Sequence, residues 1–279
     1  MIQAELNGKL PEVENSEDVL SSNVFGMLKY LPPQKSIFKI LEQTKDYSKQ
    51  RNSLIDNLNA QNISLYQYDK VNYYFWKYSS VHGEPDLILI IRSSEKALEP
   101  LMLCIEAKYL SPKSREGEFD QLKDYCLSLE KSEFRKNYNE SDIADFKGNF
   151  IGIIYLTYFS QYLDVQESLG QIKKKGFNNY ESKLFELRWN DITRVLRGFE
   201  SSYEHEKMIA EDLVSLLIKK NLMDFEGFPE ISFDLRYDCL FSWITKPGKH
   251  LHHDFKGFSE LKEPGILSFY KSICLGVAK

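Results

Sequence analysis

Two apolar runs near the middle of the chain stand out from a mixed pattern of polar and hydrophobic positions. Residues 86–92 read DLILIIR and residues 101–108 read LMLCIEAK, with a polar stretch between them. Short apolar runs bounded by turn residues are typical of buried strands. We therefore predict strands over 86–92 and 101–108, and a third over 149–157, where NFIGIIYLT has the same character.

Helical periodicity marks the segments around these strands. Leu20, Val24, Leu28 and Leu31 recur at the spacing of one helix face, and two prolines follow them. This pattern predicts a helix over 16–31. The other elements that we expect are a helix over 34–46, a strand or hairpin over 63–79, a helix over 116–130, a strand over 183–188 and helices over 189–198 and 202–221.

The order of these elements predicts an α/β fold in which a central mixed β-sheet is flanked by helices. We place the core at residues 1–180. A C-terminal helical and irregular extension, packed on the core, would cover residues 181–279. The boundary near 180 is soft, and a single domain is the alternative.

Bulk composition narrows the class of protein. The chain has 279 residues and a net charge of −5, which excludes a protein that coats nucleic acid through bulk positive charge. Any contact with nucleic acid therefore needs a local patch or a metal site. The four cysteines form no closely spaced pair, so we expect no zinc ribbon or redox motif. We find no secretory signal and no apolar run of about 20 residues, so we expect a cytoplasmic protein without a membrane partner.

Charged residues at the margins of the two central strands are the candidate chemistry. Side chains alternate along a strand, so Glu106 and Lys108 share one face. The neighbouring strand begins at Asp86, and pairing that brings Asp86 near Glu106 would make two carboxylates converge. Two such charges are costly to bury unless a cation neutralises them. Oxygen ligands favour Mg²⁺ or Mn²⁺, and a lysine beside the metal suits phosphodiester hydrolysis.

These residues also resemble a known motif. Pro85-Asp86, followed after 19 residues by Glu106-Ala107-Lys108, is similar to the signature of the PD-(D/E)XK nuclease superfamily, which has the restriction-endonuclease-like fold. The flanking order is similar too, with Glu17 on an early helix, Gln121 on the helix after the E-x-K strand, and a buried strand at 150–157. The resemblance covers about residues 14–160 and is nearest to bacterial, phage-defence-type members.

The resemblance implies a role for each matching residue. Asp86 and Glu106 would bind Mg²⁺ or Mn²⁺, helped by the backbone carbonyl of Ala107. Lys108 would position the attacking water and stabilise charge on the phosphate. Gln121 would orient Lys108 or contact the substrate, and Glu17 would support the site from outside or bind a second metal ion.

The function implied is a metal-dependent nuclease in phage defence, restriction or repair. Its expected partner is nucleic acid, with DNA before RNA, and the protein could act as a homodimer or with a separate partner protein.

Each of these residues also has a plainer interpretation. Glu106 and Lys108 could lie on the solvated face of a strand. Asp86 could cap a turn after Pro85, as aspartate often does. Glu17 could serve the positive end of a helix dipole, and Gln121 could lie on a helix surface. Glu84, two residues before Asp86, is a spare carboxylate.

Two further motifs lie outside this constellation. His250, His252 and His253 stand together without a fourth ligand spaced for zinc, so we expect a solvated loop there. The basic run IKKKGF at 172–177 could touch a nucleic-acid backbone or be solvated.

Two other functions stay open. One is a catalytically inactive nucleic-acid-binding or protein-interaction module on a nuclease-like fold, which the acidic net charge favours. The other is a metal-independent structural domain. The nuclease requires Asp86, Glu106 and Lys108 to converge in space, and a metal site should raise the melting temperature when Mg²⁺ or Mn²⁺ is added.

Overall fold

The computed structural model describes residues 17–81, 83–95, 98–109, 115–116, 119–159, 161–176 and 180–224. By its internal contacts the chain divides into two compact units, Met1–Phe225 and Glu226–Lys279. All of the described residues belong to the first unit. None of its described helices is long and apolar enough to cross a membrane.

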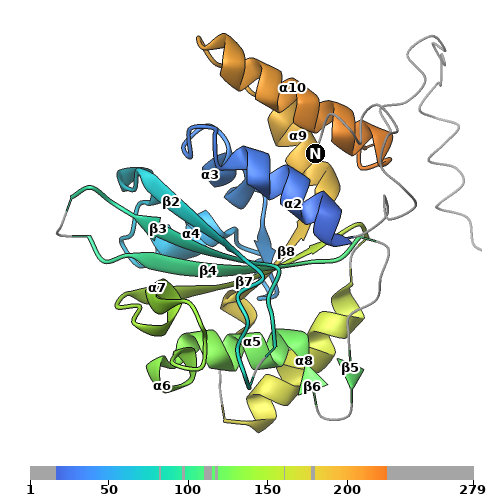
Figure 1. Cartoon of the computed structure of the whole chain (residues 1–279). Coiled ribbons are helices and arrows are strands. Elements are labelled where there is room, and N and C mark those ends of the chain that lie inside the picture. The colour runs from blue at the N-terminus through green and yellow to red at the C-terminus, as the bar shows by residue number, and fades with distance from the viewer. Residues whose placement is uncertain are drawn as a thin grey trace, which may run out of the picture. The chain divides into compact units, whose positions relative to one another are not determined.

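A six-stranded mixed sheet lies at the centre of the first unit (Figure 1). Its strand order is β1-β8-β7-β4-β3-β2. The three strands β4, β7 and β8 are parallel, and the other pairings are antiparallel. The strands are β1 (Lys45–Asp46), β2 (Lys70–Phe75), β3 (Leu87–Arg92), β4 (Leu101–Ala107), β7 (Asn149–Thr157) and β8 (Leu184–Arg188).

Helices cover both faces of this sheet (Figure 1). One face packs against α2 (Glu17–Leu28), α3 (Ile37–Leu41), α4 (Leu54–Asn59), α9 (Trp189–Arg197) and α10 (Glu204–Lys219). The opposite side carries α5 (Gln121–Glu130), α6 (Ser132–Arg135), α7 (Ser141–Ala144) and α8 (Tyr162–Lys174). Shorter elements are the 3₁₀ turns Leu65–Gln67 and Tyr180–Ser182, and a small hairpin of β5 (Arg115–Glu116) and β6 (Phe119–Asp120).

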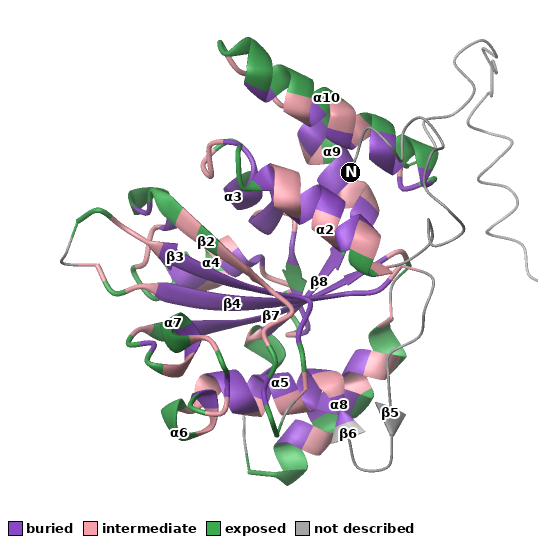
Figure 2. Cartoon of the chain, in the orientation of Figure 1, coloured by how far each residue is buried: buried purple, intermediate pink, exposed green. Residues whose placement is uncertain are grey.

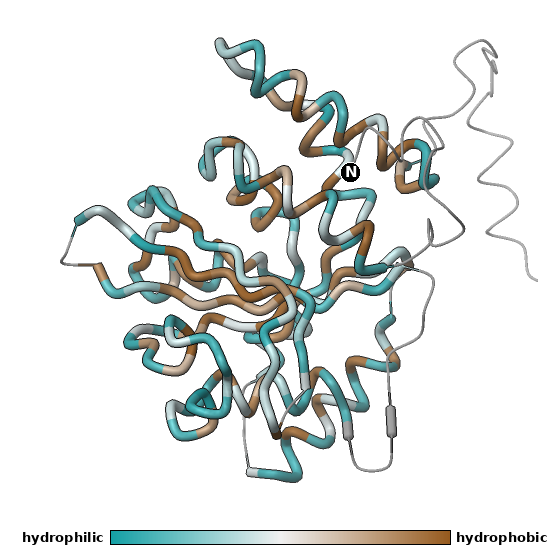
Figure 3. The backbone as a smooth tube through the Cα atoms, in the orientation of Figure 1, coloured by the Kyte–Doolittle hydropathy of each residue, from teal (hydrophilic) through white to brown (hydrophobic). Residues whose placement is uncertain are grey.

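The central strands are buried on both faces, which explains their unbroken apolar sequence. On β4, Leu103, Ile105 and Ala107 belong to the core beneath α2 and α9, whereas Met102 and Cys104 belong to the core beneath α5 and α8. Figure 2 shows β3, β4 and β7 buried along their length, and Figure 3 shows the same strands as the hydrophobic centre of the unit. The predicted α/β class and its mixed sheet flanked by helices are confirmed.

A bulge in β7 sets the register of the site. Met102 pairs with Phe150, but Leu103 pairs with Gly152, so Ile151 is an extra residue in β7. Gly152 has φ +142°, and a Cβ on it would lie 2.3 Å from the carbonyl oxygen of Lys183, so only glycine fits there. After this bulge the register is regular as far as Ala107.

Most predicted elements are present with shifted ends, and two predictions need correction. The helix expected over 34–46 covers only Ile37–Leu41, because the Thr44 side chain hydrogen-bonds the Leu41 carbonyl and residues 45–46 then join the sheet as β1. The helix expected over 116–130 begins at Gln121, because the Asp120 side chain caps it by accepting from Lys123 N, at 3.0 Å. Of the strand or hairpin expected over 63–79, the strand is present as β2, which pairs with β3.

Helix α4 was not predicted, although a sequence signal for it exists. Ser53 accepts a hydrogen bond from the backbone of Asp56, and the Asp56 side chain accepts one from the backbone of Ser53. This reciprocal pair is the capping box that marks a helix N-terminus. The spacing of Ser53 and Asp56 could therefore have located the helix.

Candidate active site

The antiparallel register of β3 and β4 brings Asp86 to Glu106. Leu87 pairs with Ile105. In this antiparallel register Asp86, which precedes Leu87, therefore lies opposite Glu106, which follows Ile105, at one end of the sheet. There the Asp86 Oδ2 atom accepts a hydrogen bond of 2.8 Å from the backbone N–H of Ala107. Two carboxylates from neighbouring strands therefore converge.

Glu17 joins this end of the sheet from the first turn of α2. The Lys108 Nζ atom lies 2.7 Å from Glu106 Oε1 and 2.9 Å from Glu17 Oε1. The second oxygen of Glu17 accepts a 2.9 Å hydrogen bond from the backbone N–H of Tyr109. Glu17 thus holds both the lysine side chain and the backbone that follows it.

All three central side chains are withdrawn from solvent. Glu106 is 1% exposed, Lys108 is 6% exposed and Asp86 is 8% exposed. The alternative in which Glu106 and Lys108 lie on a solvated strand face is therefore wrong. An ionised group this deeply buried is costly unless it is paired, so the cluster needs an internal balance of charge.

The backbone at Lys108 is held from two further elements. Its N–H donates to the Leu156 carbonyl of β7, at 2.7 Å. Its carbonyl accepts a 3.1 Å hydrogen bond from Trp189 Nε1 at the start of α9. Trp189 is fully buried, and nothing in the local sequence pattern connects it with the E-x-K strand. Sequence reasoning missed this contact because it joins positions 81 residues apart.

The pKa values of all three side chains are raised by burial or by neighbouring charges. Burial, and then the neighbouring Asp86, raises the pKa of Glu106 to about 8. Burial raises the pKa of Asp86 to about 6, although the Ala107 hydrogen bond and Lys108 oppose this shift. Burial disfavours the Lys108 cation, but Glu106 and Glu17 outweigh it and raise the pKa of Lys108 above its ordinary value. Lys108 therefore stays a cation at neutral pH.

The cluster can accept additional positive charge. When its three carboxylates (Asp86, Glu106 and Glu17) are ionised, one lysine opposes them and two negative charges are left over. The Glu106 Oε2 atom is also buried and has no hydrogen-bond partner among the residues that the structure describes. A buried acceptor in this state costs about 1–3 kcal/mol, and more when it is charged.

A divalent cation would satisfy both needs, and the residues present fit Mg²⁺ or Mn²⁺. Within the described part of the chain, no group of three or more His, Cys, Asp or Glu side chains could hold a metal. The protein would therefore supply two carboxylates, Asp86 and Glu106, and the carbonyl of Ala107. Mg²⁺ is commonly bound in this way, by one or two carboxylates with the remaining positions left to water and substrate oxygens.

The other predicted residues lie around this cluster or outside the described residues. Gln121 is the first residue of α5 and is half-buried, and its role stays a prediction. Glu84 is exposed, and its carbonyl accepts a 3.0 Å hydrogen bond from Tyr125 of α5. Three exposed lysines lie where α8 ends, with Lys173 and Lys174 inside the helix and Lys175 directly after it. His250, His252 and His253 lie outside the described residues.

Comparisons with known proteins add little to this geometry. No family model matches the sequence, and no curated protein matches it. Among solved structures, a chain of the MspJI restriction endonuclease in complex with a 27-mer oligonucleotide matches with 15% sequence identity and a TM-score of 0.26. The match covers 79% of this chain and 42% of that chain. At so low a TM-score we draw the function from the site itself.

Proposed function

We propose that this protein is a metal-dependent nuclease that hydrolyses phosphodiester bonds, with DNA as the expected substrate. One observation carries the proposal: Asp86 and Glu106 converge at a buried sheet end, beside the Lys108 cation, with one oxygen of Glu106 unpartnered among the described residues. Two buried acids and a lysine in this arrangement suit a hard cation and a phosphate. The resemblance to PD-(D/E)XK nucleases supports the same role for these residues, and by resemblance alone the setting would be restriction, phage defence or repair.

Each residue has a distinct task in the proposed reaction. Asp86 and Glu106 would hold Mg²⁺ or Mn²⁺, which polarises a phosphoryl oxygen and lowers the pKa of a bound water. Lys108 is kept protonated by its two carboxylate neighbours, so it would donate hydrogen bonds and would not remove a proton. Its ammonium has three N–H groups. Within the part of the chain that the structure describes, Glu106 and Glu17 account for two of them, and the third would meet a phosphate oxygen or the attacking water.

Glu17 has a supporting task in this proposal. It fixes the Lys108 ammonium at 2.9 Å and the next backbone N–H at the same distance. With Lys108 held by Glu17, the ammonium stays at the edge of the carboxylate pair when Glu106 turns toward a metal. Helix α2 would therefore serve to orient the lysine.

The test is a cleavage assay on plasmid DNA, single-stranded DNA and RNA with Mg²⁺ or Mn²⁺. It compares wild type with Lys108→Ala and Glu106→Ala, and uses Glu84→Ala as the matched control because Glu84 is exposed near the site. We expect metal-dependent cleavage by wild type and the control. Loss of one such group commonly costs on the order of 10²–10³ in rate. No metal-dependent cleavage of any substrate, or equal cleavage by all four proteins, would refute the proposal.

A second candidate is a nucleic-acid-binding module without catalysis. One observation favours it: Lys108 is already paired with two carboxylates. This module would retain nucleic acid in a gel-shift assay and leave it intact with every metal. It would also show no rise in melting temperature with Mn²⁺, because it has no native-state metal site.

A further inference from the structure

Three polar residues lie in register across the parallel strands of the sheet. Glu106 of β4 pairs with Tyr155 of β7, and Tyr155 pairs with Glu186 of β8. Residues paired directly in a sheet point to the same face. This is the face beneath α5 and α8, because Tyr155 belongs to the core on that side. The bulge at Ile151 is what aligns Tyr155 with Glu106.

Each of these three side chains has one buried polar atom without a hydrogen-bond partner in the described part of the chain. The Tyr155 hydroxyl, Glu106 Oε2 and Glu186 Oε1 have no hydrogen-bond partner among the residues described. Tyr155 is 1% exposed, so bulk water does not satisfy its hydroxyl. Buried tyrosine hydroxyls usually find a partner, and an unpartnered group points to an ordered water or ion. A donor and an acceptor in this state on adjacent strands can be satisfied together by one shared water.

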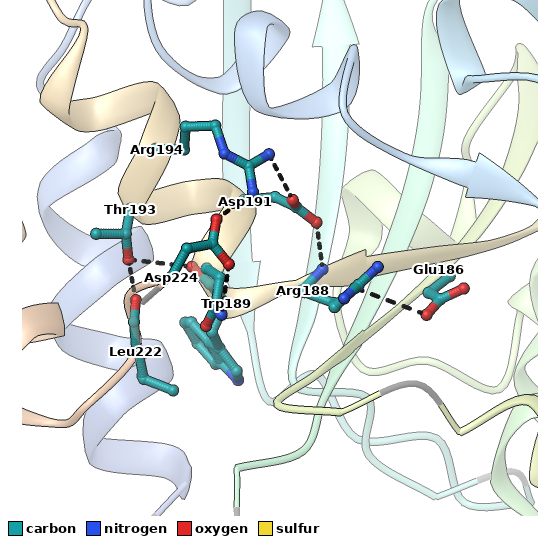
Figure 4. Close-up of polar contacts among 9 residues, drawn as sticks. Glu186, Arg188, Trp189, Asp191, Thr193, Arg194, Leu222 and Asp224 are labelled. Atoms are coloured by element: carbon teal, nitrogen blue, oxygen red, sulfur yellow. Dashed lines mark hydrogen bonds and ion pairs between the residues drawn. The ribbon is translucent and has the colours of Figure 1, made fainter. Parts of the chain in front are cut away.

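The two carboxylates that flank Tyr155 differ in the cations that lie beside them. Glu186 has its own cation, since Arg51 Nη2 lies 2.5 Å from Oε2. Figure 4 shows the second contact of this side chain, in which Arg188 Nε lies 4.0 Å from Oε1. Among the described residues, Glu106 is paired with Lys108 alone, which it shares with Glu17. The need for another donor is therefore greater at Glu106.

The charges that act on the Tyr155 hydroxyl also connect it with Glu106. Burial is the main cause that raises the pKa of Tyr155. Among the charges that act on it, Lys108 comes first, followed by Asp164, Glu106 and Glu17. Three of these four belong to the cluster at the end of β4. The hydroxyl thus lies within electrostatic reach of the candidate active site.

We propose that Tyr155 is a positioning residue of the candidate active site, which orients the Glu106 carboxylate through a water shared between its hydroxyl and Glu106 Oε2. The inference deepens the proposed nuclease function and rests on it. A hydroxyl in this position holds the carboxylate ready for a metal, as residues behind metal ligands commonly do. Removing it should weaken metal binding and leave the fold intact.

Tyr155→Phe removes only the hydroxyl, and Tyr138→Phe is the matched control. Tyr138 is buried in the same core, and its hydroxyl has a partner of its own, Ser128 at 3.1 Å. The full chain is titrated with Mn²⁺ while the melting temperature is recorded, and DNA cleavage is measured at saturating Mn²⁺ and at limiting Mn²⁺.

We expect Tyr155→Phe to unfold cooperatively in EDTA with at most a small fall in melting temperature, because the change removes one water-mediated hydrogen bond and leaves the ring packed. Its apparent Kd for Mn²⁺ should rise about ten-fold, and cleavage at limiting Mn²⁺ should fall by a similar factor with KM for DNA unchanged. Tyr138→Phe should bind Mn²⁺ as wild type does.

Two outcomes would overturn the inference, and they are distinguishable. If wild type binds Mn²⁺ and cleaves DNA, and Tyr155→Phe does both equally well, the role of Tyr155 is wrong and the nuclease proposal stands. If wild type shows neither Mn²⁺-dependent stabilisation nor cleavage, both the nuclease function and the role of Tyr155 are wrong.

Discussion

Replacing Glu106 with glutamine should change how the stability of this protein depends on pH. The pKa of Glu106 is about 8 in the folded protein, against an ordinary value of 4.5. The folded state therefore retains the Glu106 proton over a range in which the unfolded chain has lost it. By linkage, the stability from this proton is fully present below about pH 4.5 and is lost as pH rises through about 8. Glutamine cannot titrate, so Glu106→Gln should lack this loss.

The structure sets the size of the effect. Each unit of pKa difference corresponds to about 1.4 kcal/mol, and the window for Glu106 spans about 3.5 pH units, a ceiling of about 5 kcal/mol. Between about pH 5 and pH 8.5 the carboxyl should cost the wild type on the order of 4 kcal/mol relative to the variant. Asp86 titrates in both proteins, so the difference between them reports the loss of the Glu106 proton together with its coupling to Asp86.

The assay is urea unfolding in EDTA, followed by tryptophan fluorescence, at intervals from about pH 5 to about pH 8.5. Glu84→Gln is the matched control, because it removes an exposed carboxyl near the site. We expect the control to follow wild type and the Glu106→Gln curve to be flatter. If Glu106→Gln and wild type lose stability in parallel across this range, Glu106 is not the buried, proton-retaining acid described here.

Three further predictions follow from the same contacts. Mn²⁺ should raise the melting temperature more at about pH 8 than at about pH 6, because protons and metal compete for Asp86 and Glu106; an equal rise at both values would contradict a carboxylate site. Lys108→Met should lower the free energy of unfolding in urea by about 3 kcal/mol at about pH 8.5, where Glu106 is ionised, because it leaves buried carboxylates without their cation; unchanged stability would show that the lysine is not needed for balance. Gly152→Ala should cost about 2 kcal/mol or more, since its Cβ would meet a carbonyl at 2.3 Å. Gly170→Ala, in the open surface of α8, should instead add about 0.5–1 kcal/mol, and equal effects at the two glycines would refute the close approach at Gly152.

The strands were predictable because of how they are buried. β4 has helices on both sides, so almost every position in it must be apolar, and such a run is visible in the sequence without any partner. The same run made Glu106 conspicuous, since an acid inside it demands an explanation. Helix ends were less predictable. The end of α3 and the start of α5 depend on Thr44 and on Asp120, whose side chains compete with the apolar periodicity around them.

Some residues of the candidate site could be recognised from the sequence, and others could not. The family resemblance pointed to Asp86, Glu106, Lys108 and Glu17, and the structure brings these four together. Neither Trp189 nor Tyr155 was singled out. Their relation to the site depends on the docking of α9 and on the bulge in β7, and neither is encoded in a motif around the residue itself.

The sequence by itself determined which side chains share a face of a strand or helix. That Glu106 and Lys108 point the same way follows from the two-residue period of the backbone, which holds for any strand at that position. The tertiary structure decided which faces meet. Glu17 reaches Lys108 across 91 residues, and the β3–β4 register brings Asp86 to Glu106. Periodicity is a local property of the chain, whereas register and docking depend on how distant apolar surfaces pack together.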